Sequence, residues 1–102
     1  MNNTLINKSI YNHDKSINFS TNLSVENIKK KIFKFCNIYN YKITEPNDFK
    51  YTISINDTDS LIVEINFGMN DNMIKIYHNF GSESLTKDIM VKIANEINNK
   101  IY

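Results

Sequence analysis

The chain has 102 residues, a formal net charge of +1 and a single cysteine, Cys36. This length suits one small domain with a single hydrophobic core, which favours a binding module over an enzyme with an elaborate active site. The nearly balanced charge excludes a whole-molecule field that would attract nucleic acid, and the absence of arginine removes the side chain best suited to recognising guanine. A lone cysteine cannot form an internal disulfide, so we expect a reducing, cytoplasmic location.

Residues 1–14 show no hydrophobic period, and we expect an N-terminal arm followed by a single domain at 15–102. This polar start is typical of neither a signal peptide nor a membrane span. The segment 15–20 then alternates apolar and polar residues, with Ile17 and Phe19 on one side. The alternation predicts a first strand, at the edge of a sheet.

A strongly amphipathic helix is predicted at 24–39. Ser24 can accept a hydrogen bond at the helix N-terminus, and Glu26 lies in the first turn, where the helix dipole favours negative charge. One stripe of the helix is apolar and consists of Val25, Ile28, Ile32, Phe35, Cys36 and Tyr39. The opposite side is basic and consists of Lys30, Lys31 and Lys34, with Lys29 at its border. We expect the stripe to be buried against a sheet and the basic side to be exposed.

Three consecutive segments within 49–80 alternate apolar and polar residues, and the rest of the chain must fold around them. Their apolar positions are Phe49, Tyr51, Ile53, Ile55, then Leu61, Val63, Ile65, Phe67, and finally Ile74, Ile76 and Phe80. The connections 56–59 and 68–72 contain the Asn, Asp and Gly residues that tight turns require. A short extended segment at 41–44, which we expect to end before Pro46, precedes them. The pattern predicts an antiparallel meander with one apolar face.

A second amphipathic helix is expected after Gly81, capped by Ser82 or Ser84. Its apolar stripe consists of Leu85, Ile89, Met90, Ile93, Ala94, Ile97 and Ile101. Two amphipathic helices and a sheet with one apolar face bury one another only if both helices cover that face. We therefore predict an α+β fold of order β-α-β-β-β-β-α, an antiparallel sheet of four to five strands with two helices packed on one face. The first helix, at Ile32 and Phe35, should contact the second at Ile93 and Ile97.

No combination of residues in the sequence favours catalysis or metal binding. Cys36 lies within the apolar stripe of the first helix, which favours a buried thiol with a raised pKa. His78 falls on the inward face of a strand, and we expect it to hydrogen-bond the backbone at the edge of the core. The acidic turn 57–59 lacks the remaining oxygen ligands of a calcium loop and is expected to be solvated. We predict that the protein is not an enzyme and has no catalytic residues, metal or cofactor.

The candidate functional site is the basic side of the first helix, which consists of Lys29, Lys30, Lys31 and Lys34. Lysine-rich helix faces are most often only solvated, so the alternative is a surface without a ligand. At about 1 kcal/mol for each lysine near an anionic bilayer, the four would contribute roughly 4 kcal/mol, which corresponds to a dissociation constant of about 1 mM. We therefore predict an anionic-surface site that is useful only beside a second membrane or protein contact.

The last third of the chain carries a family resemblance. A strand at 73–78 and then Gly81-Ser82 are followed by the helical sequence Lys92-Ile93-Ala94-Asn95-Glu96-Ile97. This end resembles kinase-associated domain 1, which lies at the C-terminus of several Ser/Thr protein kinases, and the order of the predicted elements agrees over residues 15–102. The resemblance implies a sheet with both helices on one face and a non-catalytic regulatory or targeting module.

Domains of that family bind anionic phospholipids through surface basic residues, and some hold a protein kinase domain in an inhibited state. The partners implied for this chain are an anionic membrane surface or an acidic protein surface, and a protein kinase domain. The implied location is cytoplasmic, with peripheral attachment to a membrane.

The alternative is a stand-alone protein–protein interaction module, an adaptor or an inhibitor. It would dock through the edge strand near Ile17 and Phe19, through the N-terminal arm, or through the open face of the sheet. The polar positions of that face are Lys50, Thr52, Ser54, Glu64, Asn66, Lys75 and Tyr77. We expect no nucleic-acid partner under either hypothesis.

Overall fold

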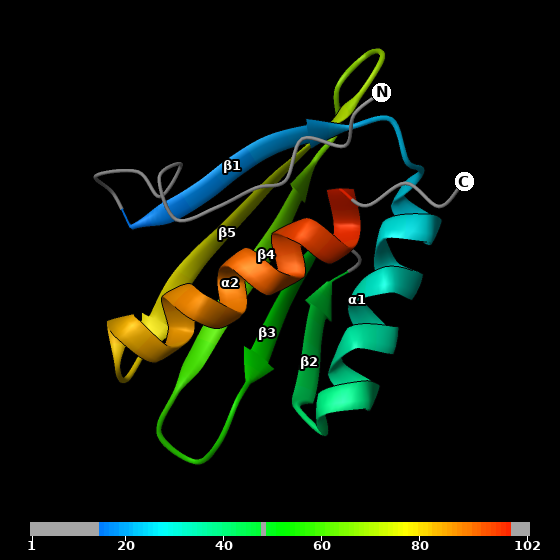
Figure 1. The fold of residues 1–102 in the computed structure, drawn as a ribbon. Helices are drawn as coiled ribbons and strands as arrows, with labels where there is room; N and C mark the ends of the chain where they lie inside the picture. Colours follow the sequence, from blue (N-terminus) through cyan, green and yellow to red (C-terminus); the bar gives the residue numbers. More distant parts are fainter. Residues whose placement is uncertain (1–14, 48, 99–102) are drawn as a thin grey trace.

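The computed structural model describes residues 15–47 and 49–98. In chain order its elements are β1 (Ser16–Thr21), α1 (Val25–Tyr39), β2 (Lys42–Asn47), β3 (Lys50–Ser54), β4 (Ser60–Asn66), β5 (Asn72–Phe80) and α2 (Glu83–Asn98). The strands form one antiparallel sheet in the order β1-β5-β4-β3-β2 (Figure 1). The predicted α+β fold and element order are confirmed, and β1 is an edge strand as expected. The proposed arm at 1–14 and the apolar residue Ile101 lie outside the described residues.

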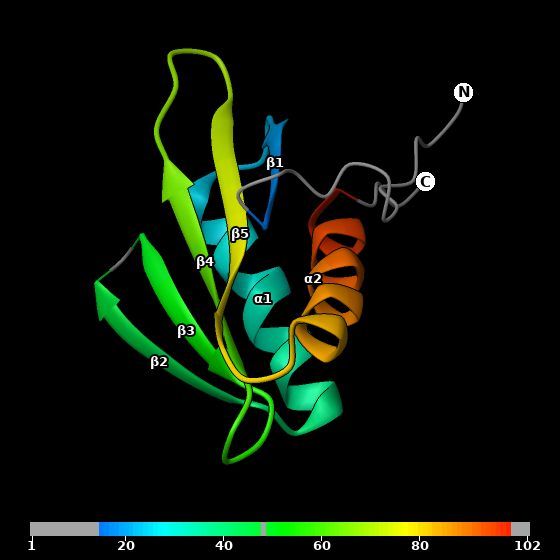
Figure 2. The ribbon, with the colours of Figure 1, turned by 90° about the vertical axis from the view of Figure 1, so that its left-hand side faces the viewer.

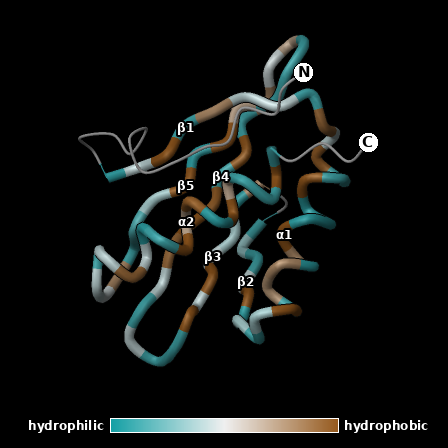
Figure 3. Tube along the Cα trace, viewed as in Figure 1, coloured by the Kyte–Doolittle hydropathy of each residue, from teal (hydrophilic) through white to brown (hydrophobic). Residues whose placement is uncertain are grey.

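Both helices lie on the same side of the sheet, and the other side is open (Figure 2). The predicted two-layer packing is therefore confirmed. Ile32 and Phe35 of α1 and Ile93 and Ile97 of α2 belong to one buried cluster, together with the inward side chains of the sheet such as Tyr51. The outer side of α1 is largely hydrophilic (Figure 3). The core is thus the space between the sheet and the two helices.

A serine directly precedes each helix and caps its N-terminus, as expected. The Ser24 hydroxyl accepts a hydrogen bond from the Asn27 N–H at 3.2 Å, and the C-terminal end of α1 is capped by Asn40, which adopts a φ of 62°. At the start of α2 the Leu85 N–H donates to the Ser82 hydroxyl at 3.3 Å. Of the two serines proposed as the cap of α2, Ser82 therefore makes the hydrogen bond.

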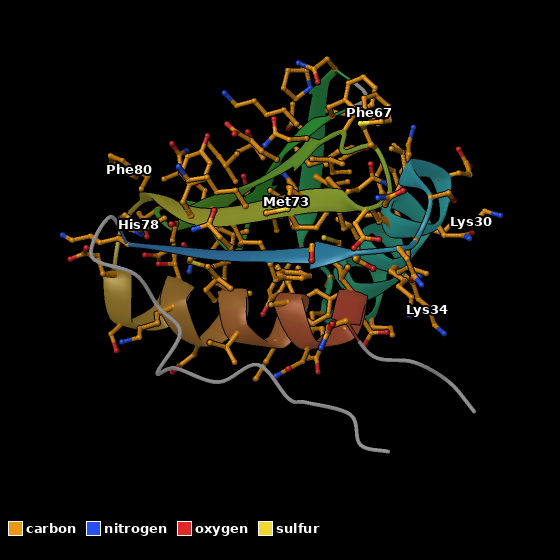
Figure 4. The ribbon with its side chains drawn as sticks, turned by 90° about the horizontal axis from the view of Figure 1, so that it is seen from above. Lys30, Lys34, Phe67, Met73, His78 and Phe80 are labelled. Atoms are coloured by element: carbon orange, nitrogen blue, oxygen red, sulfur yellow. The ribbon has the colours of Figure 1, made fainter. Side chains whose placement is uncertain are left out.

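A β-bulge near the end of β5 reverses the direction of its last side chain. Leu61 pairs with His78 whereas Ser60 pairs with Phe80, so that Asn79 is an extra residue on β5. Because paired residues point to the same face, Phe80 lies with Ser60 on the open face and is 65% exposed. Figure 4 shows Phe80 and His78 on opposite sides of β5. The prediction that Phe80 faces the core is wrong, because the bulge shifts the alternation by one residue.

The series of inward residues on β4 ends one position earlier than predicted. The last pair between β4 and β5 joins Asn66 to Met73, so Phe67 lies beyond the ladder. Phe67 is 68% exposed, and its ring centroid lies 4.8 Å from that of Phe49 in an edge-to-face arrangement. The prediction that Phe67 belongs to the core is wrong, because alternation places a side chain on a face only while the strand remains paired.

Strand β2 continues through the proline that was expected to end it. The register with β3 is irregular between Thr44 and Asn47, and Pro46 lies within this irregular stretch. A proline is tolerated there because β2 is an edge strand, where a missing N–H removes no bond from a second neighbour.

The buried stripes of the two helices are shorter than predicted. Tyr39, at the end of the stripe on α1, and Leu85, at the start of the stripe on α2, are exposed.

Candidate anionic-surface site

The four candidate lysines of α1 fall into two pairs with different environments. Lys30 and Lys34 are exposed on the outer side of the helix, away from the sheet (Figure 4). They lie four residues apart, so their side chains are neighbours on one helix face. The structure therefore places two of the predicted site residues together on an accessible surface, and their role in binding stays a prediction.

The other two lysines connect α1 to neighbouring elements. Lys29 Nζ lies 2.8 Å from the Glu45 carboxylate of β2, and both side chains are about one third exposed. Lys31 Nζ donates to the backbone oxygen of Glu96 in the last turn of α2 at 3.3 Å. A cation at that place is favoured because the C-terminus of a helix carries a partial negative charge. Lys29 and Lys31 thus contribute to the packing of α1, and helical periodicity alone did not distinguish them from Lys30 and Lys34.

A surface cleft lies beside the exposed lysines. It has a volume of about 640 Å³ and runs from the β1–α1 connection to the C-terminal end of α2. Among residues 15–47 and 49–98, its charged lining residues are Lys30, Lys31 and Asp71, and its apolar lining includes Leu23 and Ile97. The described side chains of this lining thus include two lysines and one aspartate. It could accept a small anionic group presented at the surface.

The connection between β4 and β5 carries large apolar side chains into solvent. This loop projects beyond the sheet at one end of the molecule (Figures 1 and 2). Met69 is fully exposed, and Phe67 enters the loop from β4. A second cleft, of about 520 Å³, joins Phe67 and Gly68 of the loop to Val25 and Lys29 in the first two turns of α1. The sequence pattern placed Met69 only in a turn. An apolar residue among Asn, Asp and Gly was nevertheless a signal of an exposed apolar tip.

The centre of the open sheet face is closed by its own side chains. Ile62 pairs with Thr52 and Tyr77 and is buried even though it points away from the helices. The Tyr77 hydroxyl donates to the Glu64 carboxylate at 2.6 Å, and the Lys50 ammonium lies 3.7 Å from the same carboxylate. Desolvation and this hydrogen bond raise the pKa of Tyr77 to about 12. The exposed apolar residues of this face, Met73 and Phe80, lie away from that centre.

Cys36 and His78, the two residues considered for chemistry, are both packed against other parts of the fold. Cys36 is buried in the core, and desolvation raises the pKa of its thiol to about 11. The thiolate needed for nucleophilic or metal-binding chemistry is therefore scarce at neutral pH. His78 Nδ1 lies 2.8 Å from the Thr86 hydroxyl, so its ring contacts a side chain of α2, whereas a backbone partner was predicted. Within residues 15–47 and 49–98, no group of three or more His, Cys, Asp and Glu side chains could hold a metal ion.

The acidic turn 57–59 has a structural role that the sequence did not indicate. Asp59 was expected to be solvated but is buried, and its carboxylate accepts the Ser82 N–H at 2.6 Å. This hydrogen bond holds the pKa of Asp59 below its ordinary value. Asp59 also accepts from the Thr58 hydroxyl at 3.1 Å. It therefore fastens the β3–β4 turn to the start of α2.

The chain matches no protein-family model and no curated protein. In the described part of the chain, neither helix is long and apolar enough to span a bilayer. Any functional interpretation therefore depends on the geometry of the surface, where the exposed lysines, the basic cleft and the apolar loop are the features that the core does not use.

Proposed function

We propose that the domain is a non-catalytic targeting module that attaches reversibly to anionic membrane surfaces through Lys30 and Lys34. The observation that carries this proposal is the exposure of both lysines, one helical turn apart, on the side of α1 that faces away from the core. The basic cleft beside Lys30 adds a place for an anionic headgroup. The resemblance of the sequence to kinase-associated domain 1 implies the same function, although no family model matches the chain.

The energy available from the two exposed lysines sets a limit on this attachment. At about 1 kcal/mol for each lysine, they contribute roughly 2 kcal/mol, which corresponds to a dissociation constant of about 30 mM. Lys29 adds little because Glu45 neutralises it, and Lys31 is held by its hydrogen bond to the backbone oxygen of Glu96. The attachment is therefore weak and sensitive to salt unless another contact acts beside it.

A protein-interaction module that docks on the open sheet face is the second candidate. The exposure of Phe80 and Met73 on that face favours it. It ranks below the membrane hypothesis because the hydrogen-bonded Tyr77 and Glu64 occupy the centre of the face, where a stable protein interface would place its apolar residues.

Sedimentation of the full chain with vesicles tests the proposed function. We expect binding to phosphatidylcholine vesicles that contain phosphatidylserine, release in high salt, and little binding to phosphatidylcholine alone. The double variant Lys30→Glu, Lys34→Glu should lose this binding and keep the thermal midpoint of the wild type, because both side chains are exposed.

The matched control is Lys42→Glu, Lys92→Glu, which changes exposed lysines on β2 and α2. Each Lys→Glu change lowers the charge by two, so both double variants have a formal charge of −3 in place of +1. Only the variant on α1 should lose binding. Equal loss in both variants, or equal binding to the two kinds of vesicle, would show that no specific basic site exists.

A further inference from the structure

Phe67 and Met69 form an exposed apolar tip on the β4–β5 loop. Single apolar residues on a surface are common and need no explanation. These two differ because they lie in a projecting loop of five residues, 67–71, with only Gly68 between them. The Phe67 ring also rests edge-to-face against Phe49, which fixes its direction before any partner arrives. The tip is thus presented outward by the fold.

The tip lies at the same end of the molecule as the exposed lysines. Asp71 of the loop and Lys30 of α1 line one cleft, while Phe67 and Lys29 line the second. Figure 4 shows Phe67, Lys30 and Lys34 toward one end, with His78 and Phe80 at the opposite end. The only acidic residue of the loop is Asp71, and Lys30 on the shared cleft offsets its repulsion of an anionic surface.

The shape and charge of this end favour a bilayer as its partner. A protein interface of standard size uses about 20 to 30 residues on each side, whereas the loop offers five on a narrow projection. A bilayer accepts an apolar projection without a preformed pocket, and its anionic headgroups complement the neighbouring lysines. We propose that Phe67 and Met69 insert into the interfacial region of an anionic bilayer while Lys30 and Lys34 contact its headgroups. This inference rests on the proposed function, and it supplies the second contact that two lysines require.

Met69→Trp provides a direct test, because the chain contains no tryptophan and the introduced indole is then the only one. With vesicles that contain phosphatidylserine, in low salt, we expect the tryptophan emission of this variant to shift to the blue and to be quenched by lipids brominated on their acyl chains. The control is Phe80→Trp, which places the same probe at an exposed position at the other end of the molecule. The emission of the control variant should not change with the same vesicles.

A loss-of-function pair tests whether the tip adds affinity. Phe67→Ser, Met69→Ser should weaken binding to the anionic vesicles by roughly 10-fold for each side chain that inserts, because apolar surface stays in water. Phe80→Ser is the matched control and should bind as the wild type. The thermal midpoint of Phe80→Ser should stay close to the wild-type value, and that of the double variant should fall only slightly, through the lost contact between Phe67 and Phe49, since all three side chains are exposed.

The outcomes separate this inference from the proposed function. If the wild type sediments with anionic vesicles but the emission of the Met69→Trp variant is unchanged, the tip does not insert and the lysines act without it. If the emission of that variant shifts without lipid and depends on protein concentration, a second copy of the chain covers the tip and the inference is wrong. If the wild type binds no anionic vesicle, the proposed function and the inference are both overturned.

Discussion

Replacing Phe35 with alanine should remove the largest buried side chain of α1 from the core. Phe35 is only 5% exposed and belongs to the cluster that joins both helices to the sheet. Its ring centroid lies 4.7 Å from that of Tyr39 and 6.1 Å from that of Tyr41, so the substitution also removes two aromatic contacts. The cavity would lie where α1 meets the start of β2.

The expected loss of stability is large for a domain of this size. Buried Phe→Ala substitutions reduce the free energy of unfolding by about 3 to 5 kcal/mol, through lost transfer energy and the cavity that remains. The whole free energy of unfolding of such a domain is roughly 5 to 15 kcal/mol. With a denaturant slope of about 1.5 kcal/mol per molar urea, the midpoint should fall by roughly 2 to 3 M. Urea titration followed by circular dichroism measures both the midpoint and the slope.

Phe80→Ala is the matched control, because it makes the same chemical change at a side chain that the bulge turns toward solvent. It should change the free energy of unfolding by less than about 0.5 kcal/mol. A Phe35→Ala variant that unfolds at the wild-type urea concentration would refute the assignment of the buried face of α1. An equally large loss of stability for Phe80→Ala would show that the bulge does not turn Phe80 toward solvent.

Three further predictions concern the thiol and the junction between the β3–β4 turn and α2. Cys36, whose pKa is raised to about 11, should resist a thiol reagent at pH 8 in the folded protein and react at once in 6 M guanidinium. Asp59→Asn should lower the thermal midpoint at pH 7, and the difference from wild type should shrink below about pH 4. The reason is that a carboxylate with a depressed pKa stabilises the fold above its unfolded pKa, and this contribution is lost as pH falls through the folded pKa. Gly81→Ala should lower the free energy of unfolding, measured by urea titration, by more than about 1 kcal/mol, because Gly81 has a φ of +92° and a Cβ there would meet Asp59 Oδ1. Ser84→Ala, at an exposed position, serves as the control.

The elements of the fold were predictable because their signals are local. The burial of Ile28, Ile32, Phe35 and Cys36 follows from their helical spacing, which places all four on one side of α1 whatever the sheet that covers them. The limits of α1 also follow from adjacent residues, since the Ser24 hydroxyl accepts the N–H of Asn27 and Asn40 adopts the left-handed conformation. The position of both helices on one face follows from the need to bury two stripes and one apolar sheet face together.

The candidate site was only half predictable because the environment of a lysine depends on distant segments. Periodicity places Lys29, Lys30, Lys31 and Lys34 on or near one side of α1, yet it contains no information about Glu45 on β2 or the last turn of α2. These two elements contact Lys29 and Lys31 and leave the exposed surface to Lys30 and Lys34. A similar limit applies to Asp59, whose partner Ser82 lies 23 residues further along the chain.

Phe67 and Phe80, two of the residues wrongly assigned to the core, are exposed for different reasons. Phe80 turns outward because Asn79 adds a residue to β5, and the Asn79 amide donates to the Ser60 hydroxyl, so the bulge has a structural cause. Phe67 turns outward because β4 ends, and its ring packs edge-to-face against Phe49, which is itself exposed, and not into the core. Departures from a local pattern without a structural cause are expected at functional sites. The tip formed by Phe67 and Met69, beside Lys30, is therefore where function should be sought before the open face that carries Phe80.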